Sequence, residues 1–233
     1  MFYEFFRILG LVTGYPLQWL FFKKKVYYEG KKYSSWKKGG KLFISNHYNI
    51  LDYGLNCFMV FPRKLFAVTS EMPFKNKLLR FGMKFFGAIQ ANRVTGDMSF
   101  VDKSAQVISK GKLVQIFPEG RNTPDGEMHP FKPSYVMIAA LANCKIVPII
   151  TDGNYGIFKR VSVIIGNEID LGELLGKDPA TFTKEDIQLA NQLVYQKAQE
   201  LRQTLFQLKQ RKGKKWLFIC YLTYLHTQHF GGR

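Results

Sequence analysis

Between residues 41 and 166 the chain alternates short apolar runs with segments of helical periodicity, and this alternation restricts the fold more than any other feature. The apolar runs read KLFIS, LFAVTS, AIQAN, KLVQIF, KIVPIIT and RVSVIIG, and each has the length of a strand. The segments between them predict helices over residues 50–61, 98–110 and 135–142. Strands that alternate with helices are typical of an α/β fold, so we expect a mixed, largely buried sheet flanked by helices.

The two ends of the chain depart from this pattern and divide the sequence into three parts. These are residues 1–38, 39–182 and 183–233, and the middle part holds the α/β pattern. The first part joins an apolar, aromatic-rich stretch to seven lysines that end just before a Gly-Gly turn. The last part predicts a long amphipathic helix after a capping box formed by Thr183 and Asp186. A basic cluster ends this helix, just before the run WLFICYLTYL, and consists of Lys209, Arg211, Lys212, Lys214 and Lys215.

The chain carries 34 Lys and Arg against 17 Asp and Glu, a net charge of +17 that implies an anionic partner. Because the basic residues cluster beside apolar aromatic segments at both ends, we expect N-terminal and C-terminal helices at an anionic membrane surface. The apolar stretch of residues 8–22 is short for a full span, which favours an interfacial or re-entrant anchor. A first helix packed on the domain core, and solvated lysines beside ordinary core helices, are the alternatives.

The chain has three cysteines, and none of them has the spacing of a metal site or of a disulfide framework. They are Cys57, Cys144 and Cys220. Isolated cysteines in odd number are typical of a reducing compartment. Together with the basic ends, this predicts a protein on the cytoplasmic face of the cell membrane, peripheral or monotopic.

The stretch SNHYNILD places His47 and Asp52 five residues apart, just ahead of a predicted helix. On one regular helix the two side chains would differ in direction by about 140°, so they meet only if the helix begins between them. Asn49 is a good N-cap, which puts Asp52 in the first turn and His47 in the loop before it. An ionised carboxylate bonded to one ring nitrogen would leave the other nitrogen as a general base. The alternative is a histidine that only packs or caps.

A second polar cluster follows the strand KLVQIF, where the sequence continues PEGRNTPDGEMHPFKPS. Turns at strand ends are where α/β folds place their chemistry. Glu119 lies at this edge, Gly120 allows a close approach of the backbone to a ligand, and Arg121 offers a planar fork for phosphate. Arg93, at the end of the strand AIQAN, is a second candidate for binding an anion. Taken alone, an arginine at such a position is more often a surface charge.

Together these stretches resemble the glycerolipid acyltransferases, the 1-acylglycerol-3-phosphate acyltransferase family. NHYNILD matches the family's His-x-x-x-x-Asp motif, GAIQANR its second motif, FPEGRNT its third and IVPIIT its fourth. The order and approximate spacing agree over roughly residues 39–170, and the four motifs together are specific where one alone is not. The resemblance implies transfer of a fatty acyl group from a thioester of CoA or acyl-carrier protein to a hydroxyl of 1-acylglycerol-3-phosphate, which forms phosphatidic acid in phospholipid synthesis.

Carried over by position, the resemblance makes His47 the base that deprotonates the acceptor hydroxyl and Asp52 the residue that orients it. The substrate side of the site would be formed by Arg93, Glu119, Gly120 and Arg121, with Pro118 and Pro148 in the acyl or acceptor pocket. The arginines would hold the acceptor phosphate of the lysophospholipid. No metal and no cofactor is implied beyond the acyl-CoA or acyl-carrier protein co-substrate.

Two departures from the family's pattern affect the expected phosphate site. Where the family often carries a lysine pair before Glu-Leu, this chain reads TSEM at residues 69–72. After Phe-Pro-Glu-Gly the family commonly has Thr-Arg-Ser, whereas this chain has Arg-Asn-Thr, so the arginine is displaced by one. The acceptor headgroup therefore either differs or is held by the arginines alone.

Three other interpretations compete with this one. A nucleic-acid-binding module rests on charge alone and matches no recognised motif, so we expect no nucleic acid partner. A metal-dependent hydrolase would draw on His226 and His229, which lie three apart in the tail without a neighbouring carboxylate. Within the acyltransferases, the same motifs serve an enzyme that acylates another lysophospholipid or an amino-lipid acceptor.

Overall fold

The computed structural model describes a mixed α/β fold over most of the chain. The described residues are 23–30, 38–49, 51–77, 87–92, 96–123 and 126–230, with 5, 8–10, 12–14, 16, 80 and 83, and for 73 and 211–230 only the backbone is described. The strands are β1 (Lys23–Tyr28), β2 (Lys41–Ser45), β3 (Leu65–Ser70), β4 (Ile89–Ala91), β5 (Leu113–Ile116), β6 (Ile146–Thr151) and β7 (Arg160–Ile165). They form one seven-stranded sheet in the order β1-β7-β6-β2-β5-β3-β4. The expected mixed, buried sheet is confirmed.

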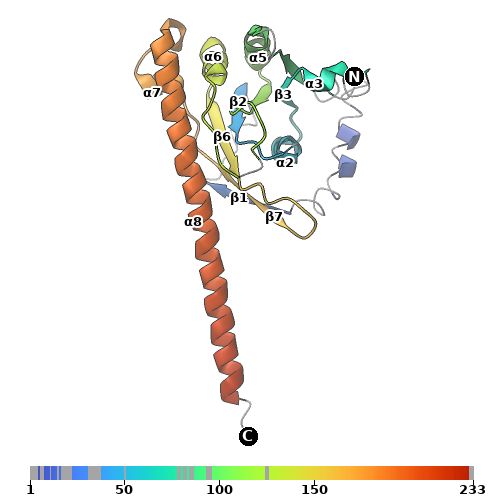
Figure 1. Cartoon of the computed structure of the whole chain (residues 1–233), viewed down its shortest axis with the longest axis vertical. Helices are drawn as coiled ribbons and strands as arrows, with labels where there is room; N and C mark the ends of the chain where they lie inside the picture. Colours follow the sequence, from blue (N-terminus) through green and yellow to red (C-terminus); the bar gives the residue numbers. More distant parts are fainter. Residues whose placement is uncertain are drawn as a thin grey trace.

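Helices cover both faces of this sheet (Figure 1). They are α2 (Leu51–Val60), α3 (Met72–Lys75), α5 (Ser99–Ser109), α6 (Ser134–Leu141), α7 (Leu171–Leu175) and α8 (Lys184–Phe230), with a 3-10 turn at Pro179–Thr181. One face packs against α2, and the opposite face packs against α5, α6 and α8. The sheet is therefore the middle of three layers.

The central strand β2 shows why the sheet is buried on both sides. Leu42 and Ile44 point into the core shared with α5, α6 and α8, whereas Phe43 points into the core shared with α2. All three side chains are fully buried. A strand between two helical layers needs apolar residues on both faces, which explains the continuous apolar run in its sequence.

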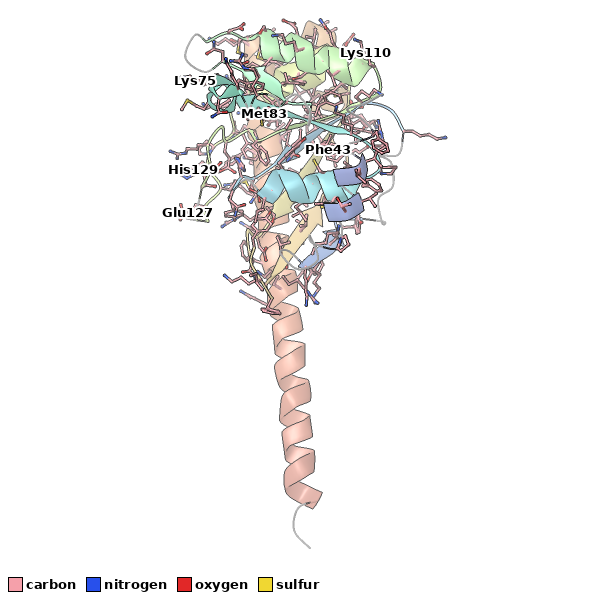
Figure 2. All side chains as sticks on the ribbon, turned by 90° about the vertical axis from the view of Figure 1, so that its right-hand side faces the viewer. Phe43, Lys75, Met83, Lys110, Glu127 and His129 are labelled. Carbon is pink, nitrogen blue, oxygen red and sulfur yellow. The ribbon has the colours of Figure 1, made fainter. Side chains whose placement is uncertain are left out.

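Most pairs of neighbouring strands run parallel, and this puts several strand ends at one edge. β2 is parallel to β5 and to β6, and β3 is parallel to β4 and to β5, while β6 and β7 are antiparallel. The loops that follow β2, β3, β4, β5 and β6 therefore leave the sheet at the same edge. In Figure 2, Lys75, Glu127 and His129 lie toward this edge and Lys110 lies at the opposite one.

The strand β1 was not predicted. Lys23–Tyr28 fell within the N-terminal part of the division into three, but it pairs in parallel with β7 over its whole length. All six residues are only partly buried, as suits the edge of a sheet, where lysine side chains reach solvent. Three consecutive lysines are unusual in a strand, so the sequence pattern did not indicate one here. The α/β region therefore begins at residue 23, before the expected boundary at residue 39.

The long helix after residue 183 is present as α8. Its capping box forms, because the backbone N–H of Thr183 donates to Asp186 at 2.7 Å and the backbone N–H of Asp186 donates to Thr183 Oγ1 at 3.3 Å. Ala190, Val194 and Ala198 are buried against the sheet, so the first half of the helix is part of the core. The helix then continues well beyond the sheet through the basic cluster and the apolar run (Figures 1 and 2).

No helix among the described residues combines the length and the apolar character needed to cross a bilayer. Residues 1–22, where an interfacial anchor is expected, lie largely outside the described part of the chain. Four described apolar side chains of this stretch are exposed, namely Phe5, Ile8, Leu9 and Val12. The membrane-interface helices stay a prediction.

Candidate active site

The candidate catalytic residues lie in the loop that follows β2 and in the first turn of α2, at the edge where the parallel strands end. Asn46 fixes the start of this loop, because its side chain accepts a hydrogen bond from the backbone N–H of Thr151 and donates one to the Thr151 carbonyl, both at 2.9 Å. The ends of β2 and β6 are thus tied together. The next residue along the chain is His47.

His47 and Asp52 face each other across the start of α2. The distance from His47 Nδ1 to Asp52 Oδ2 is 3.0 Å. The helix begins at Leu51, whose backbone N–H donates to the side chain of Asn49 at 2.7 Å. The imidazole therefore lies in the loop and the carboxylate in the first helical turn, which is the geometry expected from the spacing and from the N-cap.

Asp52 is fully buried, yet its carboxylate is surrounded by hydrogen-bond donors. Besides His47, its Oδ2 accepts from the backbone N–H of Tyr48 at 2.7 Å and from that of Asn49 at 2.8 Å. Its Oδ1 accepts a short hydrogen bond from the phenol of Tyr155. Four donors around one carboxyl group suit the ionised carboxylate, which is an acceptor only. In a neutral imidazole this arrangement places the hydrogen of His47 on Nδ1 and leaves a lone pair on Nε2.

The ring and backbone of His47 are held from other directions as well. The ring stacks on Phe117, with centroids 3.9 Å apart and planes 17° apart. The His47 carbonyl accepts from the backbone N–H of Thr123 at 2.8 Å and from its hydroxyl at 3.0 Å. The side chain remains 18% exposed, so the ring is fixed in place without being sealed from solvent.

Glu119 joins two loops at this edge. Its Oε1 accepts from the backbone N–H of His47 at 3.1 Å, and its Oε2 accepts from the backbone N–H of His129 at 3.0 Å. Burial raises the pKa of this carboxyl group, and the backbone hydrogen bonds from His129 and His47 oppose that rise. The described contacts thus connect Glu119 to the loop of His47, whereas the resemblance assigned Glu119 to the substrate side of the site.

Two exposed cationic side chains lie at the turn that follows β5. Gly120 has a φ of +70°, in the left-handed region, and a Cβ atom there would lie 3.2 Å from the ammonium of Lys132. Arg121 is exposed, and its Nη2 lies 2.8 Å from Nδ1 of His129. The turn therefore presents a guanidinium and an ammonium beside backbone that carries no side chain, an arrangement suited to an anion.

The remaining predicted site residues differ in where they lie. Arg93 is outside the described residues. Pro118 is buried in the same turn as Glu119, and its carbonyl accepts from the backbone N–H of Lys132 at 2.9 Å. Pro148 lies inside β6, and its ring packs beside Gly166 on the side of the sheet that carries α8. The structure brings Pro118 and Glu119 to the strand-end edge but does not bring Pro148 there.

Sequence reasoning missed several residues of this site. Phe117 and Thr123 lie on either side of the turn at residues 118–120, close to the end of a strand. That position could have indicated that they belong to the site. Lys132 belongs to the same quoted stretch but was not singled out. Tyr155 lies 103 residues after Asp52, in the loop after β6, and no local pattern connects the two.

Metal ligation finds no support in the part of the chain that the structure describes. No group of three or more His, Cys, Asp or Glu side chains there is placed to hold a metal ion. His226 and His229 lie in α8, in the stretch for which only the backbone is described.

Comparisons with known proteins find a matching family model and similar sequences. The family model described as Acyltransferase matches residues 25–152. The chain is 25% identical over 148 residues to the chloroplastic 1-acyl-sn-glycerol-3-phosphate acyltransferase BAT2 of Brassica napus, covering 63% of this chain and 42% of that protein. It is 24% identical over 162 residues to a 1-acyl-sn-glycerol-3-phosphate acyltransferase of Cocos nucifera, covering 67% of this chain and 50% of that protein. The chain thus spans half or less of the length of these relatives.

A solved structure has the same fold. The 1-acyl-sn-glycerophosphate (LPA) acyltransferase PlsC from Thermotoga maritima superposes with a TM-score of 0.58 at 17% sequence identity. The match covers 85% of this chain and 81% of that one.

Tyr155→Phe tests whether the phenol supports the buried carboxylate. The variant removes one donor to an ionised group, so the free energy of unfolding should fall by about 1.5–3 kcal/mol. Tyr53→Phe is the matched control, because its phenol donates to the neutral carbonyl of Leu65 at 2.8 Å and its loss should cost about 0.5–1.5 kcal/mol. Urea denaturation measures both. Equal losses in the two variants would contradict a charge-assisted bond from Tyr155 to Asp52.

Proposed function

The chain belongs to the acyltransferase family, and from this membership we propose that it is an O-acyltransferase acting on 1-acylglycerol-3-phosphate. In this proposal a fatty acyl group passes from a thioester of CoA or acyl-carrier protein to the free hydroxyl of the acceptor, forming phosphatidic acid. The names of the two curated relatives support this choice of acceptor. The observation that carries it is the hydrogen bond between His47 and the buried Asp52.

The proposed chemistry follows from the tautomer that this bond favours. Nε2 of His47 takes the proton of the acceptor hydroxyl while the hydroxyl oxygen attacks the thioester carbonyl. Asp52 stabilises the imidazolium that forms. The tetrahedral intermediate then collapses, the carbon–sulfur bond breaks, and the imidazolium returns the proton to the leaving thiolate. The new ester and the free thiol leave, and His47 is again neutral.

The proposed base, His47, is held in a fixed position by its neighbours. The ring of His47 is held by Asp52 and Phe117, and its backbone is held by Glu119 and Thr123. A catalytic group held by its own packing and hydrogen bonds needs little further ordering when substrate arrives. Glu119 and Thr123 therefore act, in this proposal, as positioning residues for His47.

The acceptor phosphate is assigned to the turn after β5 and to the segment after β4. Arg121 and Lys132 are the exposed cations at the first place, and Arg93 is carried over from the sequence at the second. The chain lacks the family's usual lysine at TSEM, residues 69–72. Lys132, which the sequence did not single out, supplies an ammonium group beside Gly120.

We place the protein at the cytoplasmic face of the cell membrane, as a peripheral or monotopic protein that meets an anionic surface. The acceptor of the proposed reaction is a membrane lipid. The net charge of +17 and the basic cluster of α8 beside an apolar run suit such a surface, where each Lys or Arg contributes about 1 kcal/mol.

Product analysis tests the proposed function directly. We expect the full chain, incubated with mixed lysolipids and with both acyl-CoA and acyl-acyl-carrier protein, to produce phosphatidic acid that mass spectrometry detects. His47→Ala should lower the rate by roughly 10²–10⁴-fold, the usual contribution of a general base. An acylated product from another lysophospholipid or from an amino-lipid would identify the alternative acceptor. Absence of any acylated lipid, or full activity of His47→Ala, would overturn the proposal.

Lys132→Gln tests the phosphate assignment. Loss of one charge-assisted contact should raise the KM for the acceptor by about tenfold and leave the KM for the thioester nearly unchanged. Lys112→Gln serves as the control, because Lys112 is an exposed lysine at the start of β5, on the opposite edge of the sheet. Steady-state kinetics with each substrate varied in turn gives the comparison. Equal effects on the two KM values would contradict a phosphate contact.

A further inference from the structure

The loop between β6 and β7 exposes two large apolar side chains at the edge that carries the candidate site. Ile157 is 55% exposed and Phe158 is 84% exposed. Phe158 has a φ of 65°, a backbone conformation that is uncommon for a bulky residue. Because β6 is parallel to β2, this loop leaves the sheet at the same edge as the loop of His47.

Two basic residues follow these side chains in the sequence, and a third contacts the start of the loop. Lys159 and Arg160 follow directly and are exposed. At the start of the loop, the side chain of Asp152 is 1% exposed and pairs with Lys209 at 2.5 Å. Lys209 is the first residue of the basic cluster of α8, so this loop and the beginning of that cluster are in contact. Apolar side chains next to cations fit the interface of an anionic bilayer.

The same loop reaches the candidate active site through its first half. The phenol of Tyr155 donates to the buried carboxylate of Asp52. The ring of Tyr48, the residue after His47, packs so closely on Gly153 that a Cβ atom there would lie 2.5 Å from the ring. Only two residues, Gly156 and Ile157, separate Tyr155 from Phe158. A surface that binds the tip of this loop is therefore held close to His47.

We propose that residues 153–160 form a membrane-docking loop, in which Ile157 and Phe158 enter an anionic bilayer while Lys159 and Arg160 contact its headgroups. The docking loop turns the edge that carries His47 toward the lipid phase. This proposal rests on the proposed function in one respect. The proposed acceptor is a membrane lipid, so the edge that carries His47 has to face the bilayer. Vesicle binding itself requires no acyl transfer.

Co-sedimentation with vesicles tests the docking loop without any thioester present. The full chain is mixed with vesicles of phosphatidylglycerol and phosphatidylcholine, and its partition coefficient is compared with that of the double variant Ile157→Ser/Phe158→Ser. Loss of two apolar side chains should lower the partition coefficient about tenfold or more. Leu141→Ser is the matched control, because Leu141 is 59% exposed at the end of α6, near the starting edge of β6, and its loss should change little.

Phe158→Gly separates docking from folding. Glycine adopts a φ of 65° without strain, so this variant should be at least as stable as the parent protein in urea. Its binding to vesicles should nevertheless be weaker, because the exposed ring is lost. Unchanged partitioning of both loop variants would overturn the proposal. So would a loop-dependent dimer in analytical ultracentrifugation, because the apolar tip would then bind a second copy of the chain.

The two proposals fail in different ways. If the loop variants lose vesicle binding but no lysolipid is ever acylated, the proposed function fails and the docking loop stands. If phosphatidic acid forms normally and the loop variants bind vesicles like the parent protein, the docking loop fails and the proposed function stands.

Discussion

The site depends on one buried carboxylate that is surrounded by donors from separate parts of the chain. Asp52 receives hydrogen bonds from the imidazole of His47, from the backbone N–H groups of Tyr48 and Asn49, and from the phenol of Tyr155. A buried charge that loses its partners costs several kcal/mol, so folding and the arrangement of these groups are coupled. The imidazole is held in one orientation because the buried carboxylate needs its hydrogen bond.

The parallel sheet makes this convergence possible. β2, β5 and β6 are neighbours that end at one edge, so the loops of His47, Glu119 and Tyr155 meet although they are far apart in sequence. The paired hydrogen bonds between Asn46 and Thr151 and the two bonds that Glu119 accepts lock these loops to one another. The same topology sends the apolar tip of the loop after β6 out of this edge. Base, anion-binding turn and proposed docking loop therefore share one side of the molecule.

Local patterns were enough to predict much of this arrangement. The six apolar runs became strands, and the spacing of His47 and Asp52 around an N-cap placed the imidazole against the carboxylate, because helix geometry leaves few ways for them to meet. Contacts set by the fold were not predictable in this way. Tyr155 contacts Asp52 although it lies 103 residues later in the sequence. β1 is an edge strand whose three lysines do not fit the apolar pattern of the other strands. Pro148 matched a motif, but strand alternation directs its ring toward α8.

¹⁵N NMR of the imidazole measures directly whether Asp52 fixes the tautomer of His47. The protein labelled at its four histidines is compared with His47→Gln, whose missing signals identify the ring. We expect neutral His47 to carry its hydrogen on Nδ1, with a coupling through the hydrogen bond to the carboxylate and a bare Nε2. A neutral ring protonated on Nε2, with Nδ1 bare, would contradict the account.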